Sequence, residues 1–163
     1  MNRQLYMGID PGKMGGIAIV GKQFAMAWKY PKDIPNSAKL IKEIVSEYGE
    51  IVLACIEKVN AFYGASSKSS FAFGQNYGGW MMALSILEIP YEMVMPRMWQ
   101  KTMLDSGTGE TKARSLNMAR RLFPKIDLHY KNCDGMADAL HIARYAKLLD
   151  ERYLPRRKEK NEK

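Results

Sequence analysis

The chain of 163 residues has little cysteine and histidine, and it has no long apolar run. Its two cysteines, Cys55 and Cys133, fall in different predicted elements and form no CxxC pair. This spacing argues against a disulfide framework and against a zinc knuckle. No apolar stretch approaches the roughly 20 residues that a membrane span requires, so we expect no membrane partner. The N-terminus lacks the pattern of a signal peptide, and we expect a reducing, cytoplasmic location.

Positive charge exceeds negative charge along the chain. Lysine and arginine number 25 against 17 aspartates and glutamates, which gives a formal net charge of +8. The length suits one domain with its own hydrophobic core. A basic balance of this size favours a polyanionic partner such as nucleic acid, although an ordinary solvated basic surface is the alternative.

The apolar pattern predicts an α/β fold with a mixed five-stranded sheet and helices on both faces. The first three strands should form an antiparallel meander, and a right-handed crossover should place the fourth strand parallel to the first. Ser37 and Thr111 are the expected helix caps. The predicted strands cover residues 5–10, 17–20, 23–28, 51–56 and 91–95, and the predicted helices cover residues 37–48, 71–87, 97–104, 111–123 and 134–150.

Four acidic residues occupy the ends of these predicted elements. Asp10 and Glu57 each end an apolar strand, while Asp134 and Asp138 stand four residues apart at the start of the last helix. An unpaired carboxylate at the end of a buried strand is costly. Because adjacent parallel strands end at the same edge of a sheet, we expect Asp10 and Glu57 to meet at the edge where α/β sheets bind ligands. For Asp134, simple stabilisation of the helix start is an alternative.

Such a set of acids is suited to divalent cations. Carboxylate oxygens are the ligands that Mg²⁺ prefers, and two ions about 4 Å apart are typical of phosphodiester hydrolysis. One ion would activate the attacking water and the other would stabilise the leaving 3′ oxygen, with Mn²⁺ as a substitute. The turn after Asp10 also resembles a phosphate-binding loop of actin-like ATPases, but the chain is too short for the two lobes of that fold.

Several short motifs resemble the RuvC family of Holliday-junction resolvases, and most closely its bacteriophage branch, and the similarity covers about residues 5–146. The motifs are GIDPG at residues 8–12, IEKV at 56–59, GQNYGG at 74–79, VMP at 94–96, WQK at 99–101, TKARS at 111–115 and ADAL at 137–140. Each is weak alone, but together they are specific.

The resemblance implies a ribonuclease H-like fold, a homodimer, and magnesium-dependent paired nicking of four-way DNA junctions. It also implies that Asp10, Glu57 and Asp138 are metal ligands. Family members often carry a further acid three residues before the last one, where this chain has Gly135, and Asp134 is the candidate replacement. We expect the nuclease domain at residues 1–150 and a charged, disordered tail at residues 151–163. A phage-encoded protein would act in the host cytoplasm.

Basic and aromatic residues receive DNA-binding roles from the same comparison. Lys101 and Lys112 match lysines near the cleaved strand, and Lys112 is also a candidate catalytic residue. Arg114 belongs to the basic segment between residues 97 and 121, where binding to phosphates should weaken as salt rises. Phe62 or Tyr63 would stack on an opened base at the junction, and packing in the core is the alternative for either ring.

Three other readings of the sequence stay open. A nuclease of the same fold could act on branched or flap DNA or on structured RNA, which substrate comparison would distinguish. A non-catalytic junction-binding module would show no magnesium-dependent turnover.

Glycines 74, 78 and 79 lie inside a predicted helix, where they indicate either close approach of another backbone or of DNA, or local weakness of the helix.

Overall fold

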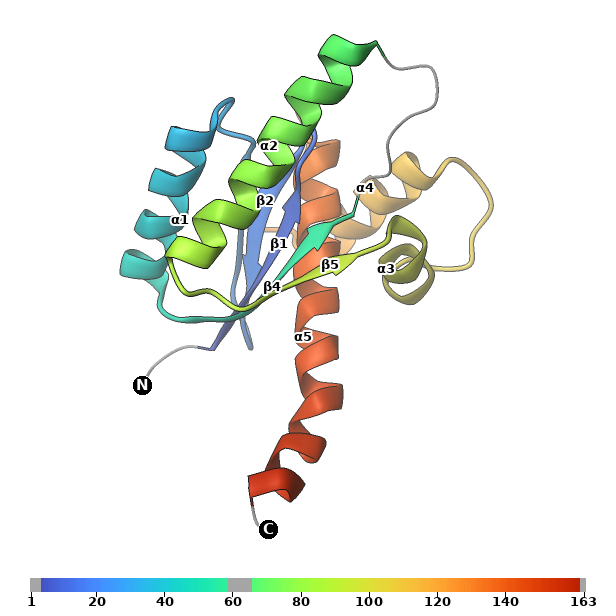
Figure 1. Ribbon diagram of the computed structural model, residues 1–163. Helices are drawn as coiled ribbons and strands as arrows, with labels where there is room; N and C mark the ends of the chain where they lie inside the picture. The colour runs from blue at the N-terminus through green and yellow to red at the C-terminus, as the bar shows by residue number, and fades with distance from the viewer. Residues whose placement is uncertain (1–3, 59–65, 162–163) are drawn as a thin grey trace.

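The computed structural model describes residues 4–58 and 66–161. One five-stranded sheet lies between two layers of helices (Figure 1), with the strand order β3-β2-β1-β4-β5. The strands are β1 (Leu5–Asp10), β2 (Gly16–Val20), β3 (Ala25–Lys29), β4 (Ile51–Glu57) and β5 (Tyr91–Val94).

The pairing of the strands confirms the mixed sheet that the sequence predicts. β1 pairs antiparallel with β2, and β2 pairs antiparallel with β3. β4 lies parallel to β1 on its other side, and β5 lies parallel to β4. β3 begins later than predicted because residues 21–24 form the turn, in which the Gly21 N–H donates to the Phe24 carbonyl oxygen at 2.8 Å.

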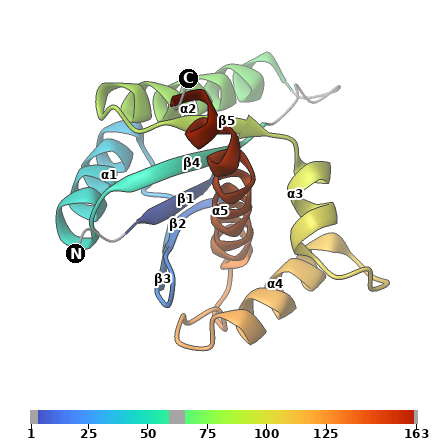
Figure 2. The same ribbon diagram turned by 90° about the horizontal axis from the view of Figure 1, so that it is seen from below.

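The helices divide between the two faces of the sheet (Figures 1 and 2). α1 (Ile34–Tyr48) and α2 (Ser67–Ile86) cover one face, whereas α5 (Asp134–Asn161) runs along the other with α3 (Pro96–Met103) and α4 (Thr111–Leu122) beside it. None of the described helices combines the length and the hydropathy that crossing a membrane demands.

The start of α1 differs from the prediction. The helix begins at Ile34, and Asp33 is its cap, with a carboxylate oxygen that accepts from the Asn36 N–H at 2.7 Å. The predicted cap, Ser37, is buried within the first turns and donates its hydroxyl to the Asp33 carbonyl oxygen at 2.6 Å. The sequence signal was ambiguous because Asp33 and Ser37 both belong to the residue types that favour this position.

Two other helix ends also differ. α4 has Glu110 in the cap position without a side-chain cap hydrogen bond, so Thr111 is the first helical residue instead of the cap. α5 continues to Asn161, beyond the end expected at Asp150. Residues 156–160 are arginine, lysine and glutamate, all of which favour helix.

Alternation along the strands decides which face each side chain joins. In β1, Leu5, Met7 and Ile9 pack in the core beneath α1 and α2, whereas Tyr6 packs in the core beneath α5. Since neighbouring strand residues point to opposite faces, Asp10 continues the α5 side.

α5 contacts β1 without an intervening side chain. A methyl group at Gly8 would collide with the Ala139 carbonyl and the Ala143 backbone nitrogen, so the glycine permits this close approach. The contact brings the first turns of α5 over the end of β1, where Asp10 lies.

The glycines of α2 have different surroundings. A methyl group at Gly79 would meet the Ile34 side chain of α1, so this glycine permits close packing of the two helices. At Gly74 and Gly78, no described atom lies within 4 Å of such a methyl group. These two positions form part of an open helix face.

Candidate active site

Asp10, Glu57 and Asp138 gather on the α5 side of one sheet edge. Ile9 of β1 pairs with Ile56 of β4, and the next residues along the two parallel strands are Asp10 and Glu57. Cys55 packs in the core beneath α5, so strand alternation turns Glu57 toward the same side as Asp10. The meeting of strand-end carboxylates predicted from the sequence is confirmed.

The loop after β1 holds Asp10 in place. The Gly12 N–H donates to Asp10 Oδ1 at 3.0 Å. Asn76 of α2 donates from its side-chain amide to the Pro11 carbonyl oxygen, and the Tyr30 hydroxyl donates to Asn76 Oδ1 at 2.6 Å. α2 therefore anchors the loop that orients the first carboxylate.

Burial and mutual repulsion raise the pKa of all three carboxylates. Burial raises the pKa of Glu57 to about 8, the charges of Asp10 and Asp138 add to this shift, and the nearby Trp99 indole N–H opposes it. Burial likewise raises the pKa of Asp138 to about 7, with further increases from the charges of Asp10 and Asp134. The pKa of Asp10 is raised by burial and by Asp134, against the lowering effect of the Gly12 hydrogen bond.

Asp134 lies at the rim of this cluster and already has a cationic partner. Its Oδ2 is 3.1 Å from the Lys112 Nζ, and 77% of the Lys112 side chain is exposed to solvent. The Asp134 charge reaches Asp10 and Asp138, and the Lys112 charge lowers the pKa of both. As the first residue of α5, Asp134 also has a favourable interaction with the helix dipole. Its role as a metal ligand stays a prediction.

Close packing explains why the position three residues before Asp138 is glycine. A side chain at Gly135 would collide with the Met14 carbonyl and with the backbone of Gly15. No acidic side chain fits at residue 135 without moving the loop that follows β1.

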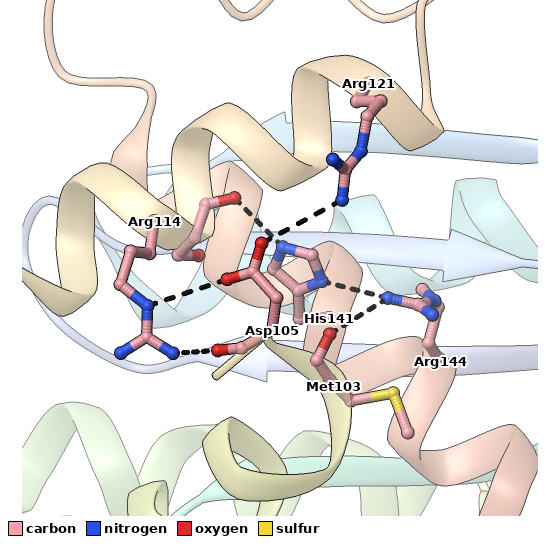
Figure 3. Close-up of polar contacts among 7 residues, drawn as sticks. Met103, Asp105, Arg114, Arg121, His141 and Arg144 are labelled. Atoms are coloured by element: carbon pink, nitrogen blue, oxygen red, sulfur yellow. Dashed lines mark hydrogen bonds and ion pairs between the residues drawn. The ribbon is translucent and has the colours of Figure 1, made fainter. Parts of the chain in front are cut away.

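The predicted DNA-binding residues do not share one environment. Lys101 is exposed in the last turn of α3, and Lys112 is exposed beside the acids. Arg114 is held by Asp105, whose carbonyl accepts from NH2 and whose Oδ1 lies 3.7 Å from Nε (Figure 3). Phe62 and Tyr63 lie outside the described residues.

Two residues that sequence reasoning missed or left undecided belong to this site. Ser115 of α4 is buried and donates its hydroxyl to Asp138 Oδ1. The helical spacing of His141 from Asp134 and Asp138 allowed either a partner of the acids or a surface histidine. His141 is fully buried and contacts the Ser115 carbonyl oxygen through Nε2 at 3.0 Å. The TKARS motif includes Ser115, but no local pattern could have assigned it this role, because its partner lies on another helix.

The chemistry of these donors fits a hard divalent cation. The three carboxylates are half-buried, and none of them has an ion-pair partner within 4.0 Å among the described residues. As the side chains stand, no group of three or more histidine, cysteine, aspartate or glutamate residues in the described chain is arranged to hold a metal ion. The fit of these residues to a divalent cation rests on their carboxylate oxygens, which such cations prefer as ligands, and on the lack of an ion-pair partner for the three carboxylates.

A cavity of about 620 Å³ lies elsewhere in the molecule. It is bounded by the β2–β3 turn, the end of α4 and the middle of α5, and none of the four acids lines it. The cavity is therefore separate from the acidic edge.

Solved structures of other proteins share the α/β fold of this chain. The chain superposes on Thermus thermophilus RuvC in complex with a Holliday junction substrate with a TM-score of 0.59, at 19% identity over 86% of this chain and 90% of that one. A second Thermus thermophilus RuvC structure gives a TM-score of 0.56, again at 19% identity, over 86% and 91% of the two chains. By sequence, no family model and no curated protein matches. The chain has a RuvC-like, ribonuclease H-like fold.

Proposed function

We propose that this protein is a magnesium-dependent endonuclease that resolves four-way DNA junctions by paired, symmetric nicks. The observation that carries the proposal is the convergence of Asp10, Glu57 and Asp138 at one sheet edge, where burial and repulsion raise their pKa values. The fold shared with RuvC, one of whose structures contains a Holliday junction, supports this substrate class. Membership of a bacteriophage branch stays a prediction.

The residues of the chain have separate tasks in this mechanism. Asp10, Glu57 and Asp138 would hold Mg²⁺, which when bound supplies an activated water and stabilises the leaving oxygen. Asp134 is a further candidate ligand at the rim. Lys112, whose side chain is 77% exposed and pairs with Asp134, would contact a phosphate beside the acids.

Exposed lysines near the site support binding to a polyanion. Lys101 and Lys112 lie at the surface of α3 and α4, in a chain of net charge +8. Arg120 is less available to bind phosphates than its charge suggests, because its Nε and NH2 donate to the Leu128 carbonyl oxygen at 3.0 and 2.8 Å. Lysines held loosely at the surface suit contacts to phosphates, which position the DNA without reading its sequence.

A homodimer would supply two acidic sites, one for each of two opposed strands. The open face of α2 supports this part of the proposal. Phe71, Met82 and Ile86 are 69, 60 and 71% exposed, and they share a face with Gly74 and Gly78 at helical spacing. An exposed apolar face of this kind is typical of a protein interface.

Cleavage of a labelled immobile four-way DNA junction tests the proposal. The protein is incubated with and without Mg²⁺, beside a linear duplex of the same sequence. We expect paired symmetric nicks in the junction alone, and only with Mg²⁺. Asp10→Asn should abolish cleavage and leave junction binding intact, because the substitution removes one charge and preserves shape.

The other outcomes each contradict the proposal in a different way. Binding without cutting would indicate a junction-binding module. Preferential cutting of flaps, forks or structured RNA would assign another substrate to the same fold. Retained cleavage by Asp10→Asn would exclude the acidic cluster as the active site.

A further inference from the structure

Asp138 is oriented by a neighbour that carries no charge. The Ser115 hydroxyl donates to Asp138 Oδ1, and the Ser115 side chain is almost entirely inaccessible to solvent. A neutral donor stabilises the ionised carboxylate without neutralising it, whereas an arginine or lysine in the same place would compete with a cation. With Oδ1 occupied by the hydroxyl, the orientation of the Asp138 carboxylate plane is restricted.

Ser115 is itself held by His141. The imidazole stacks on the Trp99 ring, with centroids 6.3 Å apart and planes inclined by 12°. Its Nε2 lies 3.0 Å from the Ser115 carbonyl oxygen, and its Nδ1 lies 3.3 Å from NH1 of Arg144 (Figure 3). Both ring nitrogens are therefore engaged inside the protein.

These contacts fix the tautomer of His141. A guanidinium can only donate, so Nδ1 accepts from Arg144 and the ring proton resides on Nε2, which donates to the Ser115 carbonyl. Arg144 also donates to the Met103 carbonyl oxygen at 3.5 Å, so the contacts reach the end of α3. Burial lowers the pKa of His141 to about 4, in agreement with a neutral ring.

We propose that Ser115 and His141 are positioning residues that preset the Asp138 carboxylate for a divalent cation. This inference rests on the metal site of the proposed function. His141 fixes the backbone of Ser115, and Ser115 fixes Asp138 through its hydroxyl, so α4 and α5 jointly define the direction of one ligand. Partners of this kind commonly change metal affinity or activity about 10–100-fold when they are removed.

Mn²⁺ binding to the full chain without DNA tests the inference, measured by calorimetry together with the melting temperature of the metal-free protein. We expect Ser115→Ala and His141→Leu to weaken Mn²⁺ affinity by about tenfold or more. His141→Gln, whose amide can still donate to the Ser115 carbonyl, should recover part of the loss.

Tyr6→Phe is the matched control. It removes another buried hydroxyl that donates to a carboxylate of α5, in this case Asp150 at 2.9 Å, far from the acidic edge. It should lower the melting temperature and leave Mn²⁺ affinity unchanged, which separates positioning from general stability.

Wild-type Mn²⁺ affinity in both Ser115→Ala and His141→Leu would overturn the inference and reduce the two residues to packing. If Mn²⁺ affinity falls in Ser115→Ala but the wild-type protein cleaves no four-way junction, the inference would be supported and the proposed function would be overturned. Absence of Mn²⁺ binding by the wild-type protein would overturn both.

Discussion

α5 carries two aspartates that each accept from a hydroxyl, Asp138 near the start of the helix and Asp150 near its middle, yet the two places differ in their neighbours. Near the start of the helix, Asp138 accepts from Ser115 and lies within electrostatic range of Asp10, Glu57 and Asp134. Farther along, Asp150 is 8% exposed and accepts from the Tyr6 hydroxyl at 2.9 Å.

The comparison teaches that burial of a carboxylate does not by itself indicate a metal site. At Asp150, the pKa of Tyr6 rises to about 12 because of burial, its hydrogen bond to Asp150 and nearby negative charge, so Tyr6 stays a neutral phenol that donates to the Asp150 carboxylate. At Asp138, burial raises the pKa most, the Ser115 hydrogen bond opposes this increase, and the charges of Asp10 and Asp134 add to it. Crowding of like charges is the signal of function.

Substitution of each aspartate by asparagine should show the largest difference between the two places. Asp138→Asn removes a proposed metal ligand, so junction cleavage should fall by more than the roughly 100-fold that loss of an outer partner causes. Asp150→Asn retains an acceptor for Tyr6, so cleavage should stay near the wild-type rate. Single-turnover rates on a four-way junction measure both. Equal losses of cleavage in the two variants would contradict the distinction between Asp138 and Asp150.

The stability of the metal-free protein should fall as pH rises from about 5 to 8. Glu57 and Asp138 have folded-state pKa values of about 8 and 7, above their ordinary values of 4.5 and 3.8. A raised pKa means that the folded state binds more protons in this window, so the contribution to stability is complete below the ordinary pKa and is lost as pH passes the folded one.

Denaturant melts across this pH range, with and without Mg²⁺, provide the measurement. Bound Mg²⁺ should offset the repulsion, so its stabilising effect should grow with pH. Glu57→Gln combined with Asp138→Asn should flatten the pH dependence of the metal-free protein, whereas Asp150→Asn should not. An unchanged slope in the double variant would show that other groups cause the loss.

Tyr6→Phe should lower the free energy of unfolding by about 1–3 kcal/mol, because the Asp150 carboxylate would lose its buried donor. Cleavage of the junction should be unaffected. Equilibrium unfolding and initial cleavage rates check the two halves of this expectation. A large loss of cleavage in a stably folded Tyr6→Phe protein would show that the Tyr6–Asp150 contact influences the acidic edge.

Lys112→Ala should have the smallest effect on stability. Its ion pair with Asp134 is open to solvent, and exposed pairs contribute about 0–1 kcal/mol. Cleavage should nevertheless fall, though less than in Asp138→Asn, because the lysine is proposed to contact a phosphate. Thermal melts and cleavage rates at two salt concentrations test both effects. A loss of stability well above 1 kcal/mol would assign Lys112 a structural role.

The sequence predicts the sheet and the meeting of Asp10 with Glu57 because these depend on strand alternation and crossover handedness, which short-range patterns carry. It predicts the helix starts less well, because Asp33 and Ser37 are both good caps. Ser115 could not be assigned from the sequence, since its contact with Asp138 depends on how α4 and α5 pack. The close contact of Gly135 with Gly15 also depends on tertiary structure, so the sequence could not predict it. The sequence shows only that glycine stands at a position where family members often carry an acid.

The most direct test of the central claim is anomalous diffraction from crystals of the protein soaked in Mn²⁺. The claim is that crowded carboxylates, and not buried carboxylates in general, form the metal site. We predict an anomalous peak among Asp10, Glu57 and Asp138, and no peak at Asp150. Manganese bound only elsewhere, or absent from the acidic edge at concentrations that support cleavage, would contradict the claim.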